Sequence, residues 1–248
     1  MGTVVSLDLR DDPVADEAVD EALAWLHDVD RRFSMWKEDS EVSRLARGEV
    51  TESEVSADVR EVLRLCEDIR VASSGVFDIR RWRSDGLMDP TGLVKGWSVE
   101  RAALILDAAG AECYSLNTGG DAVVRGEPEP GRAWRVGIQH PLLRDKVAAV
   151  VAISNLAVAT SGAYERGRHV VDARNGQPPG DLLSMTVIGS SLTLADAYAT
   201  AAFAMGREGL RWMDGIPGYS ACAITTAERL VWTPAFDRHM ASSRDEPR

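Results

Sequence analysis

Two oxygen-bearing side chains lie at a spacing that suits a metal ion. Asp196 and Thr200 are four residues apart in the segment 193–205, whose apolar pattern predicts a helix. Residues at i and i+4 share one helical face, so a carboxylate and a hydroxyl oxygen point the same way. Mg²⁺ prefers such hard oxygen donors and usually takes only one or two of them from the protein. Thr193-x-x-Asp196 also fits a helix-capping pattern. This segment alone therefore leaves a metal site and a cap equally open.

The segment 89–97 (DPTGLVKGW) brings a carboxylate, Asp89, close to Lys95 and two glycines. We expect a glycine-rich turn here, followed by a helix over 98–109 with Ser98 as its N-cap. A turn that feeds a helix exposes backbone N–H groups and favours an anion at the helix start. A plain connecting loop is the alternative interpretation.

Two further segments are typical of places where a ligand approaches the backbone. Residues 117–121 (NTGGD) follow a predicted strand, and their paired glycines lie beside the carboxylate of Asp121. A tight turn explains the same pattern. Thr160-Ser161-Gly162 ends another predicted strand and offers two hydroxyls and an unhindered N–H, as phosphate sites often do.

His169 lies on a predicted strand, in the run His169-Val170-Val171-Asp172, where a packed histidine is more typical than a catalytic base. Ser161, His169 and Asp172 do not make a convincing hydrolase triad, because the chain lacks the GxSxG elbow. The chain also has no GxGxxG after a strand, no GxxxxGK[ST], no HExxH and no EF-hand loop. Its four histidines make a multi-histidine metal site improbable.

The elements that position these residues follow from hydrophobic periodicity. Apolar stripes predict helices over 57–72, 98–109 and 193–205, and a first helix that Pro13 and Asp16-Glu17 open and whose stripe ends at Phe33. Strands are expected over 3–9, 114–116, 122–124, 134–138, 147–153, 156–160, 169–171, 185–188, 219–225 and 230–233, with Ser154-Asn155 as a hairpin turn. The strands are too close together for parallel crossovers. We therefore expect an α+β fold with a mixed, mostly antiparallel sheet, in one domain over 1–240, followed by a disordered tail over 241–248.

Composition excludes several classes of protein. The chain of 248 residues carries a formal net charge of −11 and shows no basic run, which disfavours nucleic-acid binding. It shows no signal peptide and no apolar run of membrane-spanning length. Three cysteines without metal-ligand spacing indicate reduced, packed thiols. We expect a cytoplasmic protein that does not insert into a membrane.

Taken in chain order, eight segments resemble the ApbE family, the FAD:protein FMN transferases. They are Met1-Gly2-Thr3 before a strand, 33–41 (FSMWKEDSE), 75–78 (GVFD), 89–96 (DPTGLVKG), 117–121 (NTGGD), 160–162 (TSG), 169–172 (HVVD) and 195–200 (ADAYAT). Each match is weak alone, but eight in order make a specific signal.

The resemblance implies an α+β fold related to T-fold modules, FAD as substrate and Mg²⁺ as cofactor. The implied reaction moves FMN from FAD onto a Thr or Ser hydroxyl of an acceptor flavoprotein and releases AMP. Two alternatives stay open: an FAD diphosphatase that gives FMN and AMP, and a non-catalytic FAD-binding or flavin-carrier protein.

The resemblance also assigns roles to residues of this chain. The Gly92 carbonyl, Asp196 and Thr200 would hold the metal. His169 is the first candidate for the general base, with Asp121 second. The FAD contacts would be Met1, Trp36, Val76, Phe77, Asp78, Asp89, Lys95 and Val170, together with Asn117, Gly119, Gly120, Thr160, Ser161 and Gly162 near the diphosphate or the isoalloxazine. The ring of Trp36 offers a flat face on which adenine could stack.

Overall fold

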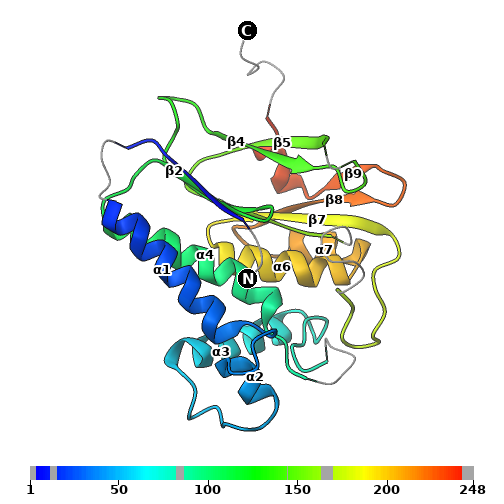
Figure 1. The fold of residues 1–248 in the computed structure, drawn as a ribbon. Helices are drawn as coiled ribbons and strands as arrows, with labels where there is room; N and C mark the ends of the chain where they lie inside the picture. Colours follow the sequence, from blue (N-terminus) through cyan, green and yellow to red (C-terminus); the bar gives the residue numbers. More distant parts are fainter. Residues whose placement is uncertain (1–3, 12–15, 82–86, 144, 163–169, 242–248) are drawn as a thin grey trace.

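The computed structural model describes residues 4–11, 16–81, 87–143, 145–162 and 170–241. Three layers make up the molecule (Figure 1): a small sheet lies on one face of a larger sheet, and helices cover the opposite face. Helices α2 (Glu41–Ala46) and α3 (Ala57–Ala72) lie on the far side of the helical layer from the sheets.

The larger sheet has seven strands in the order β1-β2-β3-β6-β7-β8-β9, and each neighbouring pair is antiparallel. Its strands are β1 (Val5–Leu9), β2 (Tyr114–Thr118), β3 (Asp121–Arg125), β6 (Ala157–Gly162), β7 (Leu182–Gly189), β8 (Ser220–Thr225) and β9 (Leu230–Trp232). The smaller sheet pairs β4 (Trp134–Gln139) with β5 (Val147–Ile153). The expected α+β fold with a mostly antiparallel sheet is confirmed.

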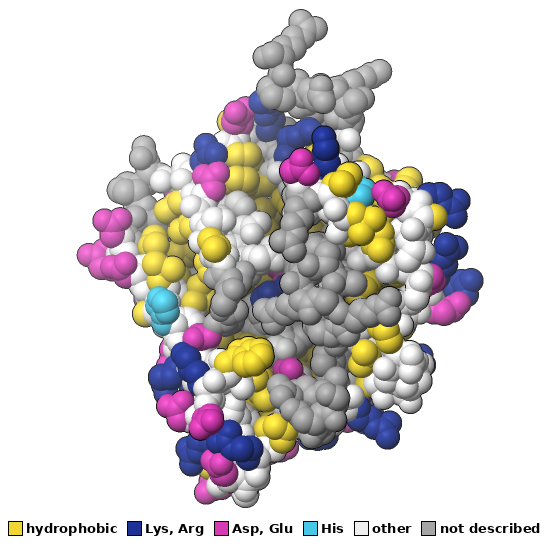
Figure 2. Space-filling view, turned by 45° about the vertical axis from the view of Figure 1, so that its right-hand side comes forward, with side chains coloured by type: hydrophobic (Ala, Val, Ile, Leu, Met, Phe, Trp, Pro, Cys, Tyr) yellow, Lys and Arg dark blue, Asp and Glu magenta, His cyan; other side chains and the backbone are white. Residues whose placement is uncertain are grey.

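The helices are α1 (Asp16–Phe33), α2 (Glu41–Ala46), α3 (Ala57–Ala72), α4 (Thr91–Ala108), α6 (Leu192–Ala204) and α7 (Arg207–Asp214), with a 3-10 helix η1 (Pro234–His239) near the end of the described chain. Within the described ranges, none of these helices is both long and apolar enough to cross a membrane. Acidic and basic side chains are intermingled on the face drawn in Figure 2, as expected for an ordinary solvated surface.

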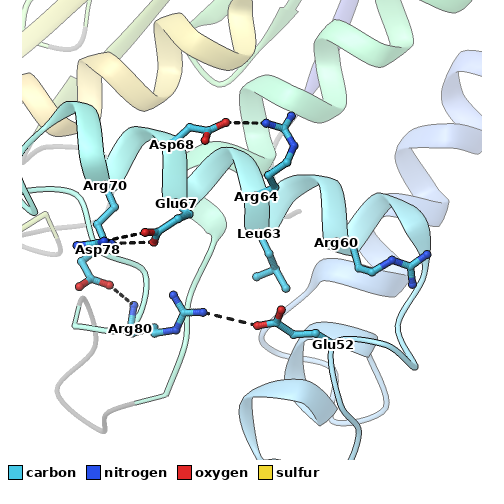
Figure 3. A pocket seen from close by; sticks show the side chains of 9 residues that line it. All are labelled: Glu52, Arg60, Leu63, Arg64, Glu67, Asp68, Arg70, Asp78 and Arg80. Atoms are coloured by element: carbon cyan, nitrogen blue, oxygen red, sulfur yellow. Dashed lines mark hydrogen bonds and ion pairs between the residues drawn. The ribbon is translucent and has the colours of Figure 1, made fainter.

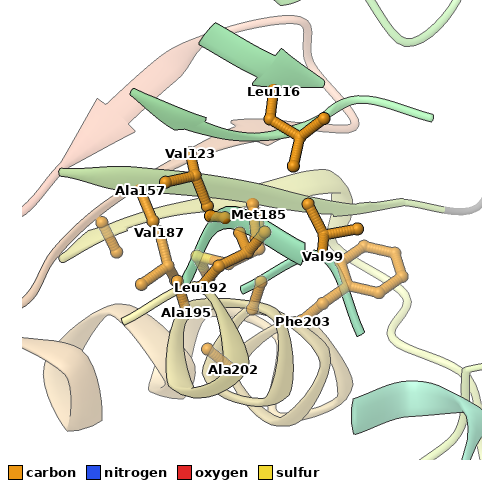
Figure 4. Packing of buried hydrophobic residues seen from close by; sticks show 14 of the residues in the cluster. Val99, Leu116, Val123, Ala157, Met185, Val187, Leu192, Ala195, Ala202 and Phe203 are labelled. Atoms are coloured by element: carbon orange, nitrogen blue, oxygen red, sulfur yellow. The ribbon is translucent and has the colours of Figure 1, made fainter. Parts of the chain in front are cut away.

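Helix α6 is the centre of the core, and its alanine-rich sequence explains why. Eleven of its thirteen residues are buried, because it packs against α4 on one side and β6 and β7 on the other. Figure 4 shows Leu192, Ala195 and Phe203 facing Val123 and Met185 of the sheet. Small side chains let the α6 backbone approach its neighbours closely, which places Thr193, Asp196 and Thr200 deep inside the protein.

Two other apolar clusters complete the core. One lies between α1, α3 and α4 and includes Val29, Cys66 and Trp97. The other fills the space between the two sheets and includes Ile138 and Cys222.

The expected turn at 89–97 is wrong, because most of that segment is helical. Helix α4 begins at Thr91, just after Pro90, and the Asp89 Oδ1 atom accepts the Thr91 N–H at 3.0 Å. Ser98 is therefore no N-cap: it is fully buried inside the helix and donates its hydroxyl to the Lys95 carbonyl. The glycines lower helix propensity, but a methyl group at Gly96 would lie 2.6 Å from the Leu192 carbonyl oxygen. Close packing against α6 explains Gly96 better than turn geometry does.

Two smaller expectations also fail. Ser154 and Asn155 do not close a hairpin: β5 pairs with β4, whereas β6 pairs with β3 and β7, so the chain passes here from one sheet to the other. The strand expected over 169–171 is absent at Val170 and Val171, and His169 lies outside the described residues. The expected tail also lies outside them except for Ala241, so the domain bounds stay a prediction.

Candidate functional site

Asp196 joins α6 to α4 rather than capping its own helix. Its side chain is almost fully buried, and its Oδ2 atom accepts the Gly96 N–H at 2.8 Å. The N-cap of α6 is Ser191, whose hydroxyl accepts the Leu194 N–H at 3.3 Å. The neighbouring carboxylate of Glu100, from α4, accepts N–H groups of the first α6 turn. The capping interpretation of Asp196 is therefore wrong.

Lys95 lies between two buried carboxylates. Its Nζ atom is 2.7 Å from Oδ2 of Asp121 and 3.9 Å from Oδ1 of Asp196. The other oxygen of Asp121 accepts the Thr160 N–H at 3.0 Å. Burial raises the pKa of the Asp121 carboxyl, and the Lys95 ammonium and the Thr160 N–H both oppose that rise. Asp121 thus holds Lys95 on one side and strand β6 on the other.

Thr200 lies one turn after Asp196, and its Oγ1 atom is 3.0 Å from Oγ of Ser161. Ser161 belongs to the last three residues of β6, which form strand pairs with β7 and are not a turn. Because side chains alternate along a strand, Ser161 faces α6 and Thr160 faces the opposite way. Thr160 there pairs its hydroxyl with that of Thr186 at 2.9 Å. Sequence reasoning missed Thr186, and only cross-strand register identifies it.

The backbone of Gly92 lies against Thr200. A methyl group at Gly92 would lie 3.5 Å from the Cγ2 atom of Thr200 and 3.2 Å from Cε2 of Phe77. One helical turn further on, and on the same face of α4, the Gly96 N–H donates to Oδ2 of Asp196 at 2.8 Å. The three residues expected to hold a metal, Gly92, Asp196 and Thr200, are therefore brought together by α4 and α6.

These residues fit Mg²⁺ by their chemistry. A carboxylate, a hydroxyl and a backbone carbonyl are all hard oxygen donors, and Mg²⁺ accepts few protein ligands because it keeps several waters or takes phosphate oxygens. In the described part of the chain, no group of three or more His, Cys, Asp or Glu side chains is placed to hold a metal. A zinc-type site is accordingly not found among those residues.

The NTGGD segment contains a tight turn, and Asp121, the first residue after it, lies beside Lys95. Thr118 pairs with Asp121, so Gly119 and Gly120 form a two-residue connection between β2 and β3. Both glycines have positive φ angles, 52° and 92°, as a type I′ turn requires. Asn117 lies within β2 between Ser6 and Ala122.

The other expected FAD contacts belong partly to the core. Val76, Phe77 and Val170 are each buried to 4% exposure or less. The Phe77 N–H donates to Ser73 Oγ, and the Val76 carbonyl accepts the Ala173 N–H. The side chains of these residues pack inside the protein.

Trp36 contrasts with them, because 94% of its surface is exposed. Met1 and His169 lie outside the described residues.

A separate open pocket of about 660 Å³ lies over α3 (Figure 3). Its charged side chains are largely matched in ion pairs, such as Arg64 with Asp68 at 2.6 Å and Arg80 with Glu52 at 3.6 Å. Asp78 lines it, but Asp196 and Thr200 do not. The pocket therefore does not coincide with the residues expected to hold the metal.

Comparison with known proteins finds one matching family and relatives that share one name. The family model described as "ApbE family" matches residues 1–82 and 80–223. A protein of Vibrio cholerae named FAD:protein FMN transferase is 31% identical over 131 residues, which are 49% of this chain and 39% of that protein. A protein of the same name from Haemophilus influenzae is 24% identical over 274 residues, covering 84% of this chain and 79% of that protein. The match to the first relative thus spans well under two thirds of that relative's length.

A solved structure titled as the flavin transferase ApbE from Vibrio cholerae shares the fold. Its TM-score is 0.83 at 22% identity, with 97% of this chain and 96% of that chain covered. The family model covers most of the sequence, and the chain belongs to the ApbE family.

Proposed function

We propose that this chain transfers FMN from FAD to a Thr or Ser hydroxyl of an acceptor flavoprotein and releases AMP. The observation that carries the proposal is the buried contact of α4 with α6, where Gly92 packs against Thr200 and the Gly96 N–H donates to Asp196, in a chain of the ApbE family. FAD as substrate follows from the name of the relatives, FAD:protein FMN transferase.

Each residue of this contact has a definable task. The Gly96 N–H fixes Oδ2 of Asp196 and so orients the carboxylate. Thr200 offers a lone pair, and the hydroxyl of Ser161, 3.0 Å away, is placed to accept the Thr200 proton. Mg²⁺ held by these oxygens and the Gly92 carbonyl would offset the charge on the diphosphate as the bond to AMP breaks.

The acceptor hydroxyl must lose a proton, and His169 is our candidate for the base. An imidazole titrates near neutral pH and suits this task. Asp121 is the weaker candidate, since Lys95 and the Thr160 N–H occupy its two oxygens. These contacts favour a positioning role for Asp121.

Trp36 is our candidate for stacking on the adenine. With 94% of the residue exposed, Trp36 leaves a large apolar ring in solvent, and a stacking ligand would cover it.

The test is incubation of the full chain with FAD, MgCl₂ and a protein acceptor, followed by mass measurement of the acceptor and by AMP detection. A gain of the FMN mass on the acceptor together with AMP supports transfer. AMP without a modified acceptor would instead make the chain an FAD diphosphatase. Neither product, with FAD still bound, would make it a flavin-binding protein.

A variant ties this activity to the proposed metal site. Asp196→Ala should abolish the Mg²⁺-dependent product, because it removes the carboxylate among the three proposed donors. Asp214→Ala, at the exposed end of α7, makes the same charge change and should keep full activity. Full activity of folded Asp196→Ala would refute the metal site.

A further inference from the structure

Three charged side chains meet beside the proposed metal site. The side chains of Asp121 and Asp196 are 0% and 3% exposed, and that of Lys95 is 20% exposed. Among the described residues, this cluster holds two carboxylates and one ammonium. Buried carboxylates are costly without a nearby opposite charge, so Lys95 stabilises both when no metal is bound.

The position of Lys95 has a consequence for metal binding. A Mg²⁺ ion bound to Oδ1 of Asp196 would lie about 2.0–2.1 Å from that oxygen. The Lys95 Nζ atom lies 3.9 Å from the same oxygen. The two cations would then be at most about 6 Å apart, as the sum of the two distances requires. Like charges at such a distance repel strongly where little water intervenes.

We propose that Lys95 is an internal cation that competes with the divalent metal for Asp196: it stabilises the metal-free protein and lowers the affinity of the site for Mg²⁺. The proposal rests on the metal site of the proposed function. Asp121 makes the competition possible, because its ion pair at 2.7 Å anchors the ammonium next to Asp196.

A purely structural role for Lys95 would lead to a different change in Mg²⁺ affinity when the residue is removed. If Lys95 only held the two helices and the sheet together, its removal would lower stability and leave Mg²⁺ affinity unchanged or weaker. If Lys95 competes with the metal, its removal should lower the stability of the metal-free protein and tighten Mg²⁺ binding. The sign of the change in affinity therefore separates the two roles.

The experiment is calorimetric titration of the full chain with MgCl₂ in the absence of FAD, with thermal unfolding measured alongside. Lys95→Met should bind Mg²⁺ about tenfold more tightly than the unmodified chain, because a unit charge near the metal is removed. Saturating Mg²⁺ should also raise the Tm of this variant by more than it raises that of the unmodified chain. Lys146→Met removes the same charge from the exposed end of the β4–β5 hairpin and should leave the affinity unchanged.

A second pair of variants covers the case in which Lys95→Met does not fold. Asp121→Asn removes the anchor of the ammonium, and adding Lys95→Met to it removes both charges of the ion pair. The double variant should bind Mg²⁺ more tightly than Asp121→Asn alone.

Equal or weaker Mg²⁺ binding on removal of Lys95, in either background, would overturn the proposal while leaving the metal site intact. If the unmodified chain binds no Mg²⁺, or if Asp196→Ala binds it equally well, both the inference and the proposed metal site fail.

Discussion

The hydrogen bond between the hydroxyls of Thr200 and Ser161 orients Thr200 as a metal ligand in the proposed site. Thr200 and Ser161 are 4% and 8% exposed, and their hydroxyl oxygens are 3.0 Å apart. A hydroxyl whose lone pair binds a cation must direct its proton elsewhere, and Ser161 supplies an acceptor. Such neighbours orient metal ligands and are costly to remove.

Thr200→Val tests this pair at nearly constant shape. The valine keeps the branched side chain but has no lone pair for a cation and no partner for the Ser161 hydroxyl. We expect Mg²⁺ affinity to fall by about tenfold or more, within the range that follows loss of a ligand-orienting contact. The unpaired Ser161 hydroxyl should lower the free energy of unfolding by about 1–3 kcal/mol.

Titration calorimetry and chemical denaturation measure these two effects. Thr200→Ser, which keeps the hydroxyl, is the matched control and should retain most of the affinity. Wild-type Mg²⁺ affinity in folded Thr200→Val would exclude the side chain from the site.

At the scale of elements, α4 shows where sequence reasoning succeeds and where it stops. Periodicity identified α1, α3, α6 and most strands, because a local apolar pattern is enough to specify them. It placed the start of α4 seven residues too late, at Ser98 instead of Thr91. The reason is that two glycines and a proline close together are typical of a turn. What stabilises that first stretch is contact with α6 about 100 residues away, which no local pattern contains.

The short elements α2, α7 and η1 were missed for a related reason. None of them exceeds eight residues, so each offers too few turns for a periodic signal. The i, i+4 spacing of Asp196 and Thr200 did predict a shared face, since both are buried at the α6 contact. The partners of that face, such as Ser161 and Lys95, depend on how α6 docks, and the residue spacing carries no information on docking.

Gly96→Ala tests the fit of α4 against α6. The added methyl group would lie 2.6 Å from the Leu192 carbonyl oxygen and 2.7 Å from Cβ of Asp196, so the helices must separate. Overpacking of this kind costs about 1–3 kcal/mol of stability. The separation should also lengthen the Gly96 to Asp196 hydrogen bond and weaken Mg²⁺ binding.

Chemical denaturation and Mg²⁺ titration measure the two effects of Gly96→Ala. Gly180→Ala is the control, since a methyl group there meets nothing within 4 Å. A Gly96→Ala protein as stable as the Gly180→Ala protein would mean that the helices are not tightly packed.

At the scale of the whole molecule, three apolar clusters raise the question of whether they unfold together. Helix α4 contributes Val99 to the first cluster and Trp97 to the second, while the large sheet contributes Val123 to the first and Val124 to the third. Shared elements of this kind favour one cooperative unit. The single domain expected from the sequence therefore becomes a proposal that unfolding can test.

The cysteines report on this cooperativity, because they lie in different clusters. Cys66 belongs to the cluster between the helices and Cys222 to the cluster between the sheets. Burial raises the pKa of Cys66 and raises the pKa of Cys222 to about 12, so neither forms the reactive thiolate at neutral pH. Both should resist a thiol-modifying reagent in the native protein, whereas the half-exposed Cys113 should react.

We expect Cys66 and Cys222 to lose protection together as denaturant is added. If the chain is one cooperative domain, each buried thiol becomes accessible only when the whole structure opens, so both labelling rates follow the same unfolding free energy. Mass spectrometry of peptides after timed labelling measures each site, with Cys113→Ser removing the background reaction. Labelling of one buried cysteine at clearly lower denaturant than the other would show that the helical layer and the paired sheets unfold separately, and the single-domain proposal would then be wrong.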